Sequence, residues 1–458
     1  MDRNQALGLI LISLILVSYF WFFAPEPPER EVLEQEPKPE IVEKEVDTEE
    51  AYTQDTSVTV VPDSLIEQEN IDKYSVFAQA AEGDQNDIAL ENENIKVIIS
   101  NKGGMIKLVE LKNYKTYQKE PLILQDFQSS DKNILLPVGE KMVNLSDLYF
   151  DAGEPIEKND TTSITFTVNS NDGKKITYTY ILPAEGFQLY KDIGVENISG
   201  GSSALVVKWI NRLKRFEDQI DGRMGSRVNT TINYTLADGT FDHLSASSDD
   251  IEESALPQPA KWVSFKQKFF TSGVISSSQF EDVKVKTSIP EGDTSVVKIA
   301  EMSYKIPLAK LNEGGYDLKY FYGPNNYQVL KKVTDQFGEN VYLGWAIFAW
   351  VNKFLIIPIF NFLENYISNY GIIIMILVLI VKLILSPLSY KSYVSMAKMK
   401  VLKPELDRLK EKTGDDMRAM QQEQMKLYQQ AGVNPLSGCI PMLLQIPILF
   451  AMFNFFPN

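Results

Sequence analysis

The sequence predicts a mixed membrane protein in which a large antiparallel β-sandwich lies between an N-terminal anchor helix and a group of C-terminal helices. Three observations support this fold class. Apolar runs at 6–23 and 371–388 are long enough to cross a bilayer, since ~20 apolar residues span ~30 Å. Residues 87–322 alternate apolar and polar side chains with period two. Charge is uneven, because residues 370–458 hold ten bases and six acids while the whole chain has a net charge of −16.

Residues 1–24 are predicted to be a transmembrane anchor. The run ends in the aromatic cluster Tyr19–Phe23, which suits a membrane interface. A cleaved signal peptide is the alternative, but no small-x-small cleavage site follows the run. We therefore favour a permanent anchor.

Residues 25–86 are predicted to be an acidic, disordered tether. From Glu26 to Glu50 the chain has eleven acids and three bases, with prolines between them. Such a composition buries too little apolar surface to fold, and the repulsion between its charges extends it.

Residues 87–322 are predicted to form the antiparallel β-sandwich. Turn residues mark hairpins around Asn101–Gly104 and Asn171–Gly173. Further strand-like runs lie at 204–210, 228–236, 262–275, 283–287 and 295–303.

The chain's single cysteine, Cys439, and single histidine, His243, restrict its chemistry. One cysteine permits no internal disulfide, and the two residues are too few for a Cys/His zinc site. His243 has no nucleophile motif around it and is expected to be structural. We predict no catalytic residues, no metal and no cofactor, so a protein that is not an enzyme.

Residues 323–369 are predicted to connect the sandwich to the membrane. The apolar run 343–367 is interrupted by Asn352, Lys353 and Pro358 and carries two tryptophans, which suits an amphipathic helix lying in the membrane surface. A crossing is the alternative. It would place the basic segment after residue 388 outside, against the positive-inside rule.

Residues 370–388 are predicted to be the first core transmembrane helix, and residues 437–458 the beginning of a second. The first contains one ionisable residue, Lys382, and Ser386 lies one helical turn further on the same face. Gln445 is a polar residue in the second. The residues leave two roles open for Lys382, which are snorkelling to the headgroups and lining a polar cavity.

Residues 389–436 are predicted to form a helical hairpin. Apolar side chains recur every three or four residues on both arms, and Gly414 and Asp415 separate the arms. This stripe either packs the arms together or contacts a substrate, and methionine suits an adaptable surface. Its predicted contact residues are Met396, Met399, Leu402, Met417 and Met420.

Four bases without an intervening acid follow the span, at Lys391, Lys398, Lys400 and Lys403. We expect them to set topology and to contact anionic membrane lipids. Nucleic acid is not expected as a partner, because no aromatic residues are interleaved with these bases.

Four stretches of the chain resemble the YidC family of membrane protein insertases, in its form with a large periplasmic domain. The two most specific are KLILSPLSYKSYVSMAKMKVLKPELDRLKEKTGDD and QEQMKLYQQAGVNPLSGCIPMLLQIPILFAMF, in the helices after residue 381. WVSFKQKFF and FYGP, at 262–270 and 321–324, are similar to family signatures in the β-domain. The resemblance covers essentially the whole chain.

The resemblance implies a periplasmic β-supersandwich, an interfacial helix and a cytoplasmic hairpin in a multi-pass protein of the bacterial inner membrane. It also implies five core spans around a hydrophilic groove that receives nascent integral membrane proteins. A Sec-type translocon and the ribosome are the implied partners. Lys382 stands where the family usually has arginine, so the charge is kept but the planar guanidinium is absent. With Lys382, the groove is expected to include Ser386 and Gln445.

The family pattern has three further spans after the point at which this sequence ends, so we expect a C-terminally truncated fragment. A different class of function also fits the residues. A membrane-anchored periplasmic binding module, for example for glycans, would use the C-terminal helices only as an anchor.

Overall fold

The computed structural model describes residues 63–198, 203–222, 224–413, 417–432 and 440–456. The predicted anchor over 1–24, most of the predicted tether and Cys439 lie outside the described residues. The predicted anchor rests on the apolar run 6–23 and on the family resemblance.

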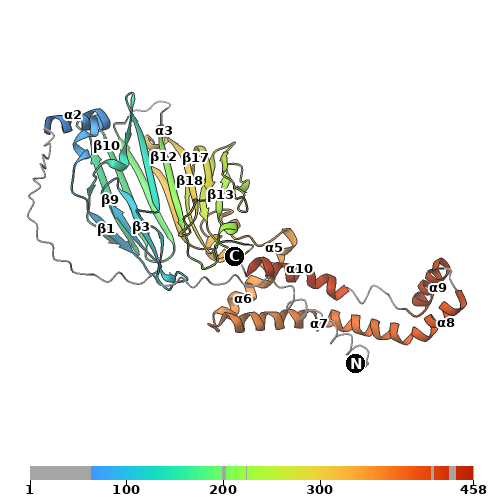
Figure 1. Ribbon diagram of the computed structural model, residues 1–458. Helices are drawn as coiled ribbons and strands as arrows, with labels where there is room; N and C mark the ends of the chain where they lie inside the picture. Colours follow the sequence, from blue (N-terminus) through green and yellow to red (C-terminus); the bar gives the residue numbers. More distant parts are fainter. Residues whose placement is uncertain (1–62, 199–202, 223, 414–416, 433–439, 457–458) are drawn as a thin grey trace, which may run out of the picture. The chain divides into compact units, whose positions relative to one another are not determined.

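The body of the chain is an antiparallel β structure in two hydrogen-bonded sheets (Figure 1). The smaller sheet has the order β1-β2-β3-β4, which are Asp87–Glu91, Ile95–Ser100, Met105–Lys115 and Pro121–Gln125. The main path of the larger sheet has the order β6-β5-β12-β18-β17-β19-β11-β10-β9-β7. These strands are Lys141–Asn144, Ser130–Val138, Ala204–Lys214, Val296–Pro307, Phe270–Ser288, Tyr316–Pro324, Gln188–Glu196, Lys175–Pro183, Thr161–Asn169 and Asp151–Ala152.

Five shorter strands join the larger sheet beside this path. β16 (Ala260–Lys266) pairs with β17 and β13 (Thr231–Leu236), and β14 (Phe241–His243) pairs with β13. β15 (Glu252–Ala255) pairs with β17, and β8 (Ile156–Lys158) pairs with β9.

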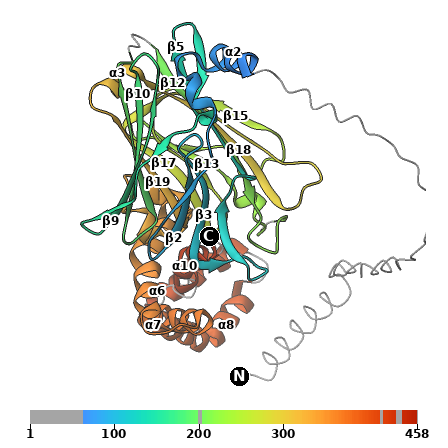
Figure 2. The same ribbon diagram turned by 90° about the vertical axis from the view of Figure 1, so that its left-hand side faces the viewer.

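The long strand β17 belongs to both layers of the larger sheet. Its first part pairs with β19 and its second part with β18. The register shifts between Glu281 and Lys284, within the pairing with β18, and Gln279 and Asp282 have positive φ angles of 64° and 47°. The strand therefore bends from one layer into the other. This bend folds one hydrogen-bonded sheet into a sandwich (Figure 2).

Aromatic side chains fill the space between the layers. The ring of Trp209 on β12 lies 4.9 Å from that of Phe265 on β16 and 6.2 Å from that of Tyr320 on β19. The Trp209 indole N–H donates to Ser130 Oγ at 2.9 Å, so its polar atom is satisfied in the core. The predicted antiparallel β-sandwich is confirmed.

Two predictions for this region need correction. The run 262–275 was predicted as one strand, but the chain turns at Gln267–Phe269 and makes β16 and β17. The predicted tether ends too late, because α2 (Asp63–Tyr74) and the 3-10 helix η1 (Ser75–Ala81) precede β1. Phe77 of η1 is fully buried in the core, and that contact supplies the stability that local composition lacks.

Short helices occupy the loops of the β-domain, and longer helices follow it. The loop helices are η2 (Leu145–Asp147), η3 (Arg227–Asn229), α3 (Leu308–Asn312), α4 (Tyr327–Leu330) and η4 (Phe337–Asn340). The later helices are α5 (Ala346–Val351), the π-helical turn η5 (Asn352–Ile356), α6 (Ile357–Glu364), α7 (Tyr370–Val401), α8 (Lys403–Thr413), α9 (Met417–Gln430) and α10 (Ile440–Phe455).

The segment that leads to the helices is fixed to the sheet by a buried asparagine. Asn340 Oδ1 accepts from Ser264 Oγ at 2.7 Å and from Asn233 Nδ2 at 3.0 Å, and its own amide donates to Phe337 O. Around this network Trp262, Phe337 and Leu343 form a second apolar cluster that extends to Ile357 of α6. The first residues of the helical part are thus held by the β-domain.

Candidate functional site

The candidate site is built on α7, the longest helix of the described chain. Asn369 caps its N-terminus, with its side-chain oxygen accepting from the amides of Gly371 and Ile372. The helix continues through Pro387 to Val401 without interruption. In the described chain, α7 and the segment Ala346–Glu364 are the two helices long and apolar enough to cross a membrane. The predicted boundary at residue 388 is therefore not a break in the helix.

One face of α7 is buried against the other helices. Ile373, Leu377, Val381 and Leu385 recur at intervals of four and pack in a cluster with Ala451 of α10 and Ile356 of η5. This spacing puts them on one stripe of the helix. The stripe fixes how α7 is rotated against its neighbours.

Lys382 and Ser386 lie outside that stripe and are exposed. The predicted i, i+4 pairing puts both on one face, as the sequence suggested. Apolar side chains such as Met375 and Leu379 are also exposed on α7. A lysine and a hydroxyl therefore interrupt a surface that is otherwise apolar.

Gln445 is not joined to this face in the described chain. It lies on α10 and is half-buried, and no hydrogen bond connects it to Lys382 or Ser386 among the described residues. Its place in a shared groove stays a prediction.

A residue that the sequence reasoning did not assign to the site fixes α10 in place. Asn352 is fully buried, and its amide donates to Leu343 O at 2.8 Å and to Ala451 O at 2.9 Å. A buried asparagine in an apolar run was the available signal, and it was interpreted only as an interruption of the run. These two hydrogen bonds connect the start of the helical part to Ala451 of α10, which lies 99 residues after Asn352 in the sequence.

Two helices, α8 and α9, follow α7, and the helical hairpin over residues 389–436 stays a prediction. α7 ends at Val401 with Leu402 as its C-cap residue, and α8 begins at Lys403, so the helix divides just before Pro404, the second residue of α8. Met396, Met399, Leu402 and Met420 are half-buried. The arms α8 and α9 pack against each other, which leaves part of the methionine stripe accessible. Met417 begins α9, but its side chain lies outside the described part.

The four predicted basic residues all lie at the exposed surface. Lys391, Lys398 and Lys400 are on the last part of α7, and Lys403 begins α8. These lysines follow the apolar part of α7 along the chain. The sequence predicts that they contact lipid headgroups there.

Large aromatic side chains are exposed at the other end of this helical group. Trp345 is 81% exposed, and Trp350, Phe362 and Tyr366 are also exposed. Tyr370 begins α7 and its hydroxyl donates to Glu364 at 2.9 Å. Such aromatic clusters are typical of membrane–water interfaces.

Comparison with known proteins gives two family matches. The family described as "YidC periplasmic domain" matches residues 87–358, and "60Kd inner membrane protein" matches residues 362–458. The first corresponds to the β-domain and its connector, and the second to the helices from α6 onward.

Curated relatives match the whole chain. The "Membrane protein insertase YidC" of Amoebophilus asiaticus is 39% identical over 100% of this chain and 75% of its own length. The proteins of the same name from Cytophaga hutchinsonii and Parabacteroides distasonis are 39% and 34% identical, each over 100% of this chain and 74% of theirs. Among solved structures, a galactose mutarotase related enzyme from Lactobacillus acidophilus covers 52% of this chain and 97% of its own, at 15% identity and a TM-score of 0.32.

Proposed function

The chain belongs to the YidC family of membrane protein insertases, and we propose that it inserts its clients along the polar face of α7 formed by Lys382 and Ser386. The observation that carries this proposal is the exposure of both side chains on an apolar helix, away from the stripe that packs against α10. The β-domain is the periplasmic domain of this family, and the helical part is its inner-membrane domain.

The position of Lys382 has an energetic consequence. A charged side chain near the centre of a membrane helix costs ~2.5–3.5 kcal/mol on the insertion scale when lipid surrounds it. A hydrated groove removes much of this cost and makes the ammonium available to a client. Ser386 adds a hydroxyl that hydrogen-bonds to water or to a polar client segment.

We propose the following course of insertion. The half-buried methionines Met396 and Met399 of α7 and Met420 of α9 receive the apolar segment of a nascent chain, because unbranched thioether side chains adapt to different sequences. Lys382 then attracts the short polar or acidic tail that has to cross. Transfer of the apolar segment into lipid drives the process, at ~0.8 kcal/mol per buried CH₂.

The same scheme assigns roles to the surrounding residues and partners. Lys391, Lys398, Lys400 and Lys403 hold the start of the hairpin at anionic headgroups on the cytoplasmic side. Gln445 on α10 is proposed as a further groove residue. A Sec-type translocon and the ribosome are proposed as partners that deliver the nascent chain, in a multi-pass arrangement with Lys382 nearer the cytoplasmic surface.

Substitution of Lys382 tests the proposal. Lys382→Met should lower the rate at which a short acidic tail crosses the membrane by about tenfold, equivalent to ~1.4 kcal/mol, whereas Lys382→Arg should retain it. The measurement is protease protection of a single-span client in proteoliposomes. Lys426→Met, on the exposed surface of α9, is the control for loss of a positive charge. Equal translocation of the acidic tail by Lys382→Met and by the unchanged protein would contradict the proposal.

A further inference from the structure

A large aromatic cavity lies where the β-domain meets the first membrane helices. Its volume is about 910 Å³, near the upper end of the ~300–1,000 Å³ range of ligand pockets. Phe270 and Phe216 of the β-domain line one side, and Phe360 of α6, Tyr370 of α7 and Phe455 of α10 line the other. Ile374, one turn into α7, also lines it, so the cavity extends toward the apolar part of that helix.

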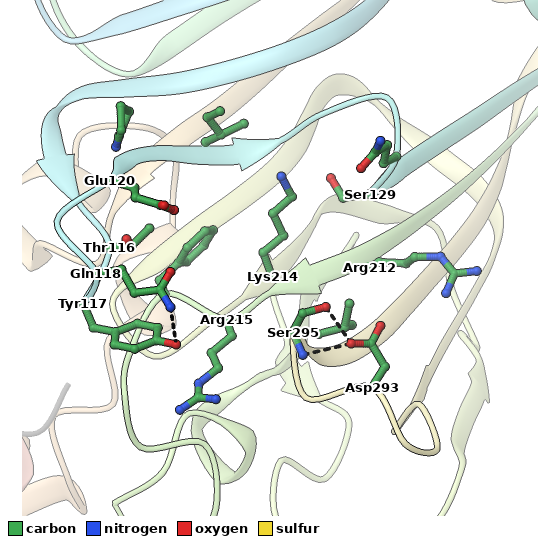
Figure 3. Close-up of a pocket in the computed structure, with 15 residues that line it drawn as sticks. Thr116, Tyr117, Gln118, Glu120, Ser129, Arg212, Lys214, Arg215, Asp293 and Ser295 are labelled. Atoms are coloured by element: carbon green, nitrogen blue, oxygen red, sulfur yellow. Dashed lines mark hydrogen bonds between the residues drawn. The ribbon is translucent and has the colours of Figure 1, made fainter. Parts of the chain in front are cut away.

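A smaller polar cleft adjoins this cavity on the β-domain (Figure 3). Its volume is about 390 Å³, and the two hollows share Thr116, Tyr117 and Phe216 as common walls. Residues that line only the cleft come from the strands and loops of the β-domain. The pair therefore has an apolar end at the membrane helices and a polar end away from them.

The cleft contains charges of both signs. Arg215 donates through Nε to Glu217 O at 3.0 Å, donates to Asp218 O and forms an ion pair with the exposed Asp218, and its guanidinium carbon lies 5.0 Å from the centroid of the Tyr117 ring. Lys214 is paired with Asp126, and Arg212 is exposed without an ion pair in the described part of the chain. Glu120 and Asp293 line the same cleft, as Figure 3 shows. A purely anionic ligand would meet these carboxylates, whereas a zwitterion would complement both signs.

Two buried acceptors in the linings of these hollows lack partners: Thr116 lies on the shared wall, and Glu217 lines the aromatic cavity next to it. Thr116 Oγ1 and Glu217 Oε1 are buried, and neither has a hydrogen-bond partner among the described residues. The other carboxylate oxygen of Glu217 accepts from Ser226 Oγ. An unsatisfied buried polar atom costs about 1–3 kcal/mol, and more when it is charged. A ligand with an N–H donor, ideally a cationic one, would satisfy Glu217.

We propose that these hollows bind a membrane aminophospholipid with the headgroup chemistry of phosphatidylethanolamine. Its ammonium group donates to Glu217, and its phosphate accepts from Arg215. An acyl chain occupies the aromatic cavity and leads along α7 into the bilayer. The orientation agrees with a lipid of the leaflet on the β-domain side, whose headgroup lies further from the membrane interior than its tails. The proposal concerns lipid binding and does not depend on the insertion mechanism.

Lipid retention tests the headgroup. The purified full chain, delipidated in detergent, is mixed with phosphatidylethanolamine, phosphatidylcholine or phosphatidylglycerol of identical acyl chains, and bound lipid is counted by native mass spectrometry. Phosphatidylethanolamine should be retained at least about tenfold more than phosphatidylcholine, whose quaternary ammonium has no N–H to donate to Glu217. Glu217→Gln should reduce this preference to near unity, while Glu313→Gln on the exposed surface should leave it unchanged.

A second variant separates the tail from the headgroup. Phe360→Ala should weaken retention of all three lipids without changing their order, because Phe360 lines the apolar cavity and not the polar cleft. Equal retention of phosphatidylethanolamine and phosphatidylcholine would overturn the proposal, as would a preference for phosphatidylglycerol. Displacement of phosphatidylethanolamine by an apolar client peptide, but not by excess lipid, would identify a client site instead. The client translocation assay is separate, so failure of one proposal leaves the other tested on its own.

Discussion

Lysine side chains in this chain occupy two opposite environments. Lys382 is exposed on an apolar helix, where the free-energy cost of its charge depends on whether lipid or water surrounds it. Lys266 and Lys191 are instead buried inside the β-domain. Lys266 Nζ donates to Asn229 O at 2.8 Å, and Lys191 Nζ lies 3.5 Å from the centroid of the Tyr178 ring. The β-domain therefore carries buried cationic groups that the insertion proposal does not use.

Burial makes these lysines sensitive to pH. It lowers the pKa of Lys266 from 10.5 to about 8, and it lowers the pKa of Lys191 well below its ordinary value. Between pH 8 and 10.5 the unfolded chain binds more protons at Lys266 than the folded chain does. The free energy of unfolding should therefore rise with pH in this window.

Lys266→Met should remove part of this dependence. The unchanged protein should gain roughly 2–3 kcal/mol of stability at this site as pH rises from 8 to 10.5, since each unit of pKa difference corresponds to ~1.4 kcal/mol. The variant should show a smaller slope. The measurement is denaturant unfolding at several pH values, followed by tryptophan fluorescence.

The upper limit of the pH series serves as an internal control. Burial raises the pKa of Tyr316 to about 12, so ionisation of this residue in the unfolded chain destabilises the fold above pH 10. The free energy of unfolding of both Lys266→Met and the unchanged protein should fall above pH 10. Identical slopes between pH 8 and 10 for the variant and the unchanged protein would contradict the assignment to Lys266.

The sequence predicted part of the candidate site at the scale of single residues. Helical spacing alone put Lys382 and Ser386 on one face, because neighbours at i and i+4 share a face in any straight helix. The contacts of Asn352 could not be predicted in this way. Its acceptor Ala451 lies in another helix, and only tertiary structure brings the two together.

At the scale of elements, local turn chemistry decided what was predictable. The hairpins at Asn101–Gly104 and Asn171–Gly173 formed as predicted, and Gly103, Gly104 and Gly173 adopt positive φ angles there. β17 was missed as a single element because it changes partner strands along its length. A change of layer depends on both sheets and has no local sequence pattern of its own.

The junction of η5 with α10 offers a prediction about one element. Asn352→Ala removes two donors from buried carbonyl oxygens of Leu343 and Ala451, so it should destabilise the docking of α10 by about 2 kcal/mol. Backbone amides within 445–455 should then exchange hydrogen faster, as mass spectrometry of peptides would show. Asn365→Ala, at an exposed position next to α6, is the matched control. Unchanged exchange in α10 would mean that the apolar cluster alone holds this helix.

At the scale of the whole molecule, the chain combines a periplasmic β-domain with an inner-membrane helical domain of the YidC family. The fold class was predictable because strand alternation and apolar runs are properties of the sequence itself. The family was predictable from short motifs around α7 and α10. The sequence did not predict how the groove residues are arranged in space. Within the described residues, Gln445 has no hydrogen bond to Lys382 or Ser386.

In the proposed mechanism, one face of α7 conducts the polar part of a client. Two exposed positions on α7, Ser386 and Ile384, test it directly. They are two residues apart and differ by ~160° around the helix, so they compare two faces at nearly the same depth. A photo-crosslinking residue at each position would be exposed to a ribosome-bound client with an acidic tail. The account predicts crosslinks to the polar tail from position 386 and few from position 384. Equal crosslinking from both positions, or crosslinks from position 384 alone, would contradict it.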